Sequence, residues 1–80
     1  MARYFFHHDD GVTVRDDEGT AFSTLELAQV EAVRLAGRML IDAADSFWNG
    51  DQWRLRVADR EDLTLFTIEV VGTFSPATSG

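Results

Sequence analysis

Two histidines and a run of carboxylates near the N-terminus are the residues whose types could support catalysis or metal binding. His7-His8 precede Asp9-Asp10, and a second acidic run covers residues 16–18. Imidazole nitrogens and carboxylate oxygens are common metal ligands, and histidine titrates closest to neutral pH. Adjacent strand residues point to opposite faces, so His7 and His8 do not readily reach one ion, and the acidic runs lack the spacing of a calcium loop. The sequence therefore predicts turn residues here, and no metal site.

Catalytic signatures are missing as well. The chain has no G-x-S-x-G or H-E-x-x-H motif and no glycine-rich phosphate loop. It also has no cysteine and no lysine, which excludes disulfides, thiolate metal sites and Schiff-base lysines. A small two-layer domain has little room for a deep pocket. We therefore expect no enzyme activity, no catalytic residues and no cofactor.

Length and charge limit the remaining functions. A chain of 80 residues forms one domain, and its 45% hydrophobic content predicts a folded core. No apolar run is long enough to cross a membrane and no signal peptide is evident, so we expect a cytoplasmic protein without membrane contact. The net charge of −7 disfavours nucleic acid and leaves room for a basic protein partner.

An apolar alternation predicts a hairpin at the N-terminus. Residues 3–8 form its first strand, and residues 9–11 form a three-residue loop with Gly11 in the left-handed conformation. This loop pairs His8 with Val12 and Phe6 with Val14. Tyr4, Phe6, Val12 and Val14 then share the core face, and Arg3, Phe5, His7, Thr13 and Arg15 share the outer face.

The next element is a helix that ends near Asp45. Ser23 and Glu26 have the spacing of a capping box, and apolar residues then recur at helical intervals. Its many alanines predict close packing on a sheet. Gly37 is expected to allow close approach of a neighbour, and Arg38 and Asp42 are spaced to form an ion pair on the outer side.

Two more strands complete the domain. Trp53, Leu55 and Val57 alternate with Arg54 and Arg56, and residues 63–71 form the last strand after a loop at residues 59–62. We expect Val57 beside Thr64, Leu55 beside Phe66 and Trp53 beside Ile68. The fold class is then α+β: a two-layer ββαββ domain over residues 1–72, with one helix on one face of a four-stranded antiparallel sheet. Its predicted strand order is 2-1-3-4, and residues 73–80 are expected to be a flexible C-terminal tail.

Several short motifs resemble a family of short bacterial proteins of unknown function. They are an R-Y-F-F-H strand (residues 3–7), a D-G turn (10–11), a D-x-x-G-T turn (16–20), an L-E-x-A helix start (25–28) and a W-R-x-x-V strand (53–57). The sequence departs from this pattern at His8, where an aliphatic residue is expected, and at Ser23, where proline is common. The resemblance implies the fold and brings no activity, substrate or site residue.

The outer face of the sheet is the most informative surface. We expect it to carry a group of basic, aromatic and apolar side chains: Arg3, Phe5, His7, Arg15, Arg54, Arg56 and Leu65. The simplest interpretation is a solvated face on which arginine stems cover apolar surface. The leading functional hypothesis is a non-enzymatic protein-interaction module that forms a homodimer or binds a protein partner through this face or an edge strand. The alternative is a module that binds single-stranded nucleic acid or another anion through the arginines.

Overall fold

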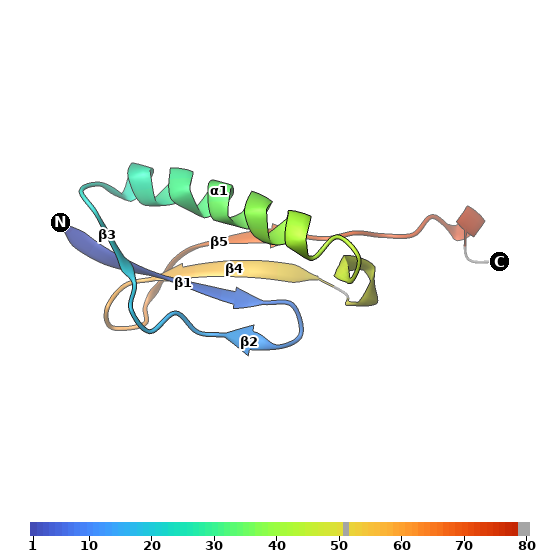
Figure 1. Cartoon of the computed structure of the whole chain (residues 1–80), viewed down its shortest axis with the longest axis horizontal. Helices are drawn as coiled ribbons and strands as arrows, with labels where there is room; N and C mark the ends of the chain where they lie inside the picture. The colour runs from blue at the N-terminus through green and yellow to red at the C-terminus, as the bar shows by residue number, and fades with distance from the viewer. Residues whose placement is uncertain (51, 79–80) are drawn as a thin grey trace.

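A single helix lies along one face of an antiparallel sheet in the computed structural model, which describes residues 1–50 and 52–78 (Figure 1). The elements in chain order are β1 (Ala2–Asp9), β2 (Thr13–Val14), β3 (Thr20–Phe22), α1 (Leu25–Asp42), β4 (Trp53–Ala58) and β5 (Thr64–Val70), with 3-10 turns at Phe47–Asn49 and Pro76–Thr78. The α+β class and the single helix are confirmed. The expected four strands are corrected to five, because Thr20–Phe22, predicted to lie between an acidic turn and the helix, forms the additional strand β3.

The sheet places β1 and β4 in its centre. The order is β2-β1-β4-β5, with β3 also paired to β1, and each pairing is antiparallel. Apart from the added β3, this agrees with the predicted order 2-1-3-4. Tyr4 and Phe6 of β1 face α1, and both are buried. A central position in the sheet removes these large apolar side chains from water, because the helix and the neighbouring strands surround them.

The first hairpin differs from the predicted pairing by two residues. His8 pairs with Val14 rather than with Val12, so the loop is Asp10-Gly11-Val12. A shift of two keeps every side chain on its predicted face. It does move the valines past the end of the core, where Val12 is 70% and Val14 is 54% exposed. Their expected place is taken by Phe22, whose ring centroid lies 6.1 Å from that of Tyr4 and 6.2 Å from that of Phe6.

A wide bulge separates β2 from β3. His8 pairs with Val14 and Tyr4 pairs with Thr20, so residues 15–19 oppose residues 5–7 and the bulged side has two extra residues. In this bulge the Asp16 carboxylate accepts a hydrogen bond from the backbone N–H of Phe6 at 3.2 Å. A side chain thus supplies the acceptor that a backbone carbonyl supplies in regular strand pairing. Bulges of this kind end regular pairing and redirect side chains.

Helix α1 begins one residue later than the capping box predicts. Its N-cap is Thr24, whose hydroxyl accepts from the Leu27 N–H at 3.2 Å, so Ser23 is not the cap. The helix ends at Asp42 rather than Asp45. Ala28, Ala32 and Ala36 form its buried stripe, and these small side chains allow the helix to lie close to the sheet.

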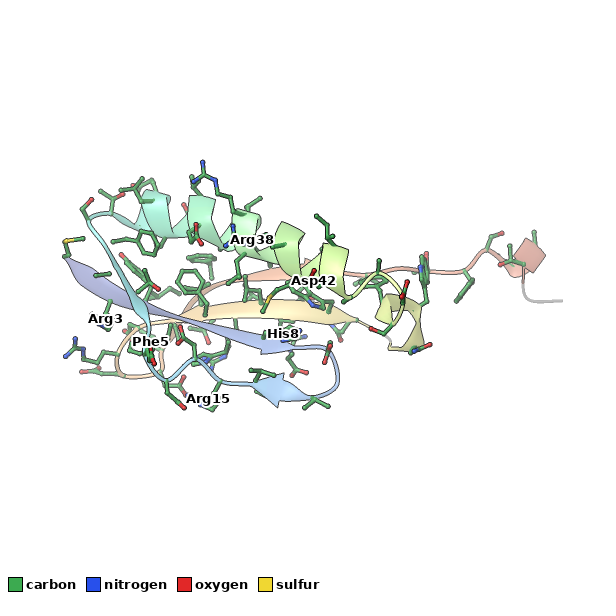
Figure 2. The ribbon with its side chains drawn as sticks, viewed as in Figure 1. Arg3, Phe5, His8, Arg15, Arg38 and Asp42 are labelled. Atoms are coloured by element: carbon green, nitrogen blue, oxygen red, sulfur yellow. The ribbon has the colours of Figure 1, made fainter. Side chains whose placement is uncertain are left out.

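Two predictions about the outer side of α1 were wrong. A Cβ at Gly37 would meet nothing within 4 Å, so no neighbour approaches this glycine. Arg38 pairs with Glu31, at 3.0 Å between Nη2 and Oε2, and not with Asp42. Figure 2 shows Arg38 and Asp42 at different positions along the helix.

Strands β4 and β5 form the second hairpin, and its pairing is also shifted by two residues. Val57 pairs with Phe66 and Leu55 with Ile68, rather than with Thr64 and Phe66. The faces of the buried residues on β4 and of Phe66 and Ile68 are as predicted, whereas Thr64, expected beside Val57, pairs with Ala58 and lies with Arg56 on the outer face. Trp53, Leu55 and Val57 are the largest fully buried side chains. The register differs because the loop is longer than expected and a bulge lies at Val57/Ala58.

The chain after β5 packs against the first 3-10 turn, Phe47–Asn49. The Phe74 ring centroid lies 5.1 Å from that of Trp48, and a Cβ on Gly72 would come within 2.7 Å of the same indole. The flexibility expected of residues 73–80 stays a prediction, and residues 79–80 lie outside the described part. Within residues 1–50 and 52–78, no helix has the length and apolar character needed to cross a membrane.

Candidate functional site

The outer face of the sheet brings only part of the predicted residue set together. His7 on β1, Arg15 after β2 and Arg56 on β4 converge on one carboxylate, that of Asp62. Arg3 and Phe5 lie near the other end of β1, where the bulge covers them. Arg54 and Leu65 belong to neither group. Figure 2 shows Arg3, Phe5 and Arg15 on the side of the sheet opposite α1.

Asp62 is the centre of the ionic cluster and was not predicted as a site residue. Its Oδ1 lies 2.9 Å from Arg56 Nη2, 3.3 Å from Arg15 Nη2 and 3.7 Å from His7 Nε2. Its backbone has φ of 67°, a left-handed conformation that aspartate tolerates better than most residues. Hydrogen bonds from Arg56 and then from Arg15 lower the pKa of this carboxyl. Asp62 therefore offsets one of the two positive charges that Arg15 and Arg56 bring to the outer face.

His7 is buried rather than presented to solvent. It is 4% exposed, and its Nδ1 accepts a hydrogen bond from the Asp16 N–H at 3.1 Å. Because Nδ1 accepts, the neutral ring carries its proton on Nε2, which faces Asp62. Burial, followed by the positive charges of Arg15 and Arg56, lowers the pKa of His7 from its ordinary value. Its two ring nitrogens are thus used to hold the bulge and to face Asp62.

Arg3 and Phe5 are held by the same bulge. The Arg3 Nη1 donates to the carbonyls of Glu18 at 2.9 Å and Gly19 at 3.1 Å. Gly19 has φ of 72°, and a Cβ there would lie 2.8 Å from both the Arg3 Cγ and the Phe5 Cε2. The backbone of Gly19 therefore covers the Phe5 ring, which is half-buried. Gly19 thus occupies the space beside this ring that a nucleobase stacked on the same side would need.

Arg54 completes the set of basic residues on this face. Its Nε lies 3.6 Å from Glu69 Oε1, and Asp9 is its partner across the strand on β1. Acidic groups thus accompany Arg15, Arg54 and Arg56, and backbone carbonyls accompany Arg3. The outer face is consequently less basic than its arginine content suggests.

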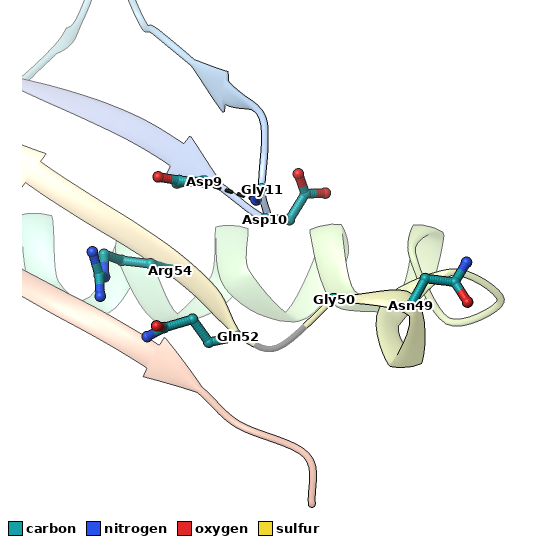
Figure 3. Close-up of a pocket in the computed structure, with 7 residues that line it drawn as sticks. All are labelled: Asp9, Asp10, Gly11, Asn49, Gly50, Gln52 and Arg54. Atoms are coloured by element: carbon teal, nitrogen blue, oxygen red, sulfur yellow. Dashed lines mark hydrogen bonds between the residues drawn. The ribbon is translucent and has the colours of Figure 1, made fainter.

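Two hollows adjoin these residues, and both are shallow and polar. The smaller has a volume of about 150 Å³ and is lined by Phe5, His7, Arg15, Asp16, Asp17, Asp59, Arg60 and Asp62. The larger, of about 400 Å³, lies between the β1–β2 turn and the start of β4, and is lined by Asp9, Asp10, Gly11, Asn49, Gly50, Gln52 and Arg54 (Figure 3). Asp9 there accepts the Gly11 N–H at 2.9 Å. Among the described residues, no group of three histidine, cysteine or acidic side chains is placed to hold a metal ion.

The two edges of the sheet differ in how they are protected. One edge is formed by the short β2 and β3 with the bulge between them, an arrangement that prevents another strand from pairing. The other edge is β5, a continuous strand over Thr64–Val70 with one bulge near its start, Glu69 as its only charge and no proline. Leu65 within it is 39% exposed, and the flanking Leu63 and Val71 are 64% and 57% exposed. An uncovered apolar strand of this length is a surface suited to pairing with another chain.

Asp16 and Asp62 are the structural residues that sequence reasoning missed. Both lie in acidic turns, where the sequence predicts only solvated carboxylates. Their partners are up to 47 positions away, as for Arg15 and Asp62, so spacing alone gives no signal. The one available signal was the short polar segment at residues 15–19. It contains Gly19, whose positive φ is typical of a turn or bulge.

Comparison with known proteins gives a family and no activity. Searches of curated proteins and of solved structures each found no match. Residues 3–71 match a family described as a domain of unknown function, DUF6894. This agrees with the resemblance to short proteins of unknown function, whereas bacterial origin and the opening motif stay predictions. Because the match spans most of its length, the chain belongs to the DUF6894 domain family.

Proposed function

We propose that this protein is a non-enzymatic interaction module that associates through the free edge of β5. The observation that carries the proposal is the contrast between the two sheet edges: β2 and β3 are two and three residues long and are interrupted by a five-residue bulge, whereas β5 is a continuous seven-residue strand with a single bulge near its start and four apolar side chains. Strand addition at such an edge supplies main-chain hydrogen bonds, and alternate side chains supply specificity.

The side chains of β5 support association as well. Phe66, Ile68 and Val70 pack against the core but remain partly exposed, because β5 is the outermost strand beneath α1. On the other face, Leu65 and Thr67 are exposed. A strand added beside β5 would cover apolar surface on both faces, at roughly 25 cal/mol for each Å² removed from water. The proposed interaction surface is therefore the edge of β5 and the side chains beside it, and not the whole outer face of the sheet.

The alternative, binding of single-stranded nucleic acid or another anion, has less support. Arg15 and Arg56 already share Asp62, and Arg54 lies beside Glu69. Recruiting them to a phosphate would break these pairs, and the net charge of −7 repels polyanions at long range. Pairing of another strand with the edge of β5 would not require breaking these ion pairs.

Sedimentation equilibrium of the wild type and of Thr67→Glu tests the proposal. Thr67 is exposed on β5 and faces Arg56 on β4, so a glutamate there suits the monomer and places a carboxylate at the edge. We expect concentration-dependent association of the wild type at micromolar to millimolar concentration, and its loss in Thr67→Glu.

Val12→Glu is the matched control. Val12 is exposed in the hairpin turn at the opposite end of the sheet order, and the substitution changes net charge equally. Its association should equal that of the wild type. A wild type that stays monomeric throughout this range, or equal weakening by both variants, would contradict the proposal.

A further inference from the structure

We infer that the strand bound at β5 is β5 of a second copy, paired antiparallel about a two-fold axis at Ile68. This inference rests on the proposed association through β5. It adds the partner, the register and the resulting architecture, a continuous sheet through two copies.

The faces of β5 limit the possible registers. Phe66, Ile68 and Val70 face α1, and Leu65, Thr67 and Glu69 face away from it. Residues directly opposite each other in an antiparallel pair lie on the same face. A register that places a helix-facing residue of one copy opposite an outward-facing residue of the other would put Glu69 beneath the helix layer. The axis must therefore pass through a residue position, so that each set meets itself.

Among such registers, the one centred on Ile68 matches the side chains best. Towards the helices it sets Ile68 opposite Ile68 and Phe66 opposite Val70 of the second copy. Towards the outer face it sets Leu65 opposite Val71 and Thr67 opposite Glu69, which is an apolar pair followed by a polar pair. A register centred on Thr67 would instead oppose Leu65 to Glu69, and one centred on Phe66 would oppose Leu63 to Glu69.

Charge is compatible with this register although both copies are acidic. Glu69 lies beside its own Arg54 at 3.6 Å and would face a threonine hydroxyl, not a second carboxylate. Helix α1 lies on one face of the sheet (Figure 1). A two-fold axis perpendicular to the sheet would therefore place both α1 helices on the same face of the joined sheet. The partly exposed Phe66, Ile68 and Val70 then lie in the middle of the new sheet, with a helix on each side.

Disulfide crosslinking tests the register, because the natural chain contains no cysteine. Disulfide bonds need Cα atoms about 4.4–6.8 Å apart, which directly opposed residues satisfy and diagonal neighbours do not. Thr67→Cys and Glu69→Cys are both at exposed positions. Mixed under mild oxidant, they should give a crosslinked dimer, whereas either variant alone should give only the background set by Val12→Cys.

Each other outcome has a definite meaning. Efficient crosslinking of Thr67→Cys alone would overturn the inference in favour of an axis at Thr67, and crosslinking of Thr67→Cys with Leu65→Cys would overturn it in favour of Phe66. In both cases self-association would stand. Background crosslinking in every mixture, together with a sedimenting dimer, would place the contact elsewhere and overturn the inference. A monomer in sedimentation would instead remove the proposed function itself.

Discussion

The imidazole Nδ1 of His7 accepts a hydrogen bond from the backbone N–H of Asp16 at 3.1 Å, and the Asp16 carboxylate accepts one from the N–H of Phe6 at 3.2 Å. These two reciprocal bonds attach the bulge at residues 15–19 to the central strand. They take the place of main-chain pairing that the bulge interrupts. Both side chains are titratable, so the attachment depends on pH.

His7 should make the protein less stable as the pH falls below about 6.5. Burial first, and then the charges of Arg15 and Arg56, lower the folded-state pKa from the value of 6.5, although Asp62 and Asp16 oppose the shift. The unfolded state therefore binds more protons just below pH 6.5. The contribution is fully present above that pH and is lost as the pH falls through the folded pKa. Urea unfolding between pH 5 and 8 measures it.

His7→Asn is the informative variant for this effect. Its Oδ1 can accept the Asp16 N–H in place of Nδ1, but it does not titrate. The pH dependence over this interval should become flatter, whereas His7→Leu should lose about 1–3 kcal/mol at every pH because a buried N–H loses its acceptor. An unchanged pH profile in His7→Asn would show that another group is responsible.

Asp16→Ala should destabilise the fold by about 2 kcal/mol, since three backbone N–H groups, of Phe6, Glu18 and Gly19, lose a charged acceptor. Partial burial opposes ionisation of Asp16, but the bonds from Gly19, Phe6 and Glu18 outweigh it and lower its pKa below 3.8. Its contribution is therefore present above pH 3.8 and is lost as the pH falls through the folded pKa. Asp17→Ala, in the exposed neighbouring position, serves as the control and should change the urea midpoint little.

Two glycine substitutions should have opposite signs. Gly19→Ala adds a Cβ that clashes with Arg3 and Phe5 at a φ of 72°, so it should lower the melting temperature. Gly37→Ala is on the open side of α1 and should stabilise the protein by about 1 kcal/mol, or raise the melting temperature by about 4–8 °C. Calorimetry of both variants checks the pair. A destabilising Gly37→Ala would mean that a neighbour covers this side of the helix.

Salt should distinguish edge pairing from anion binding. Two copies with a net charge of −7 each repel, so added sodium chloride should strengthen or leave unchanged an association driven by apolar surface. Binding to phosphate groups must instead weaken linearly in log salt. Sedimentation between about 50 mM and 500 mM salt measures the first, and titration with a fluorescent single-stranded oligonucleotide measures the second. Oligonucleotide affinity that falls with this slope would favour the arginine-based alternative.

The sequence alone determined the faces of the strands and the class of fold. Alternation at Tyr4 and Phe6, and at Trp53, Leu55 and Val57, has the period of a half-buried strand, so a register error of two residues left the faces of these side chains correct. Thr64, beyond the bulge in β5, is the exception. The alanines at four-residue intervals in α1 likewise fixed its buried side. The strand order followed from chain direction and from the need to cover β1.

The register, the fifth strand and the pairing of charges on the outer face depend on contacts between segments that are distant in the chain. Val14 was expected to cover Phe6, and Phe22 does so instead because the bulge adds two residues between β2 and β3. The pairing of Asp62 with Arg15 and Arg56 joins segments far apart in the chain through a left-handed backbone conformation that composition does not signal. For the same reason the sequence showed seven arginines but not their partners, and the free edge of β5 became visible only once the other edge was seen to be closed by its bulge.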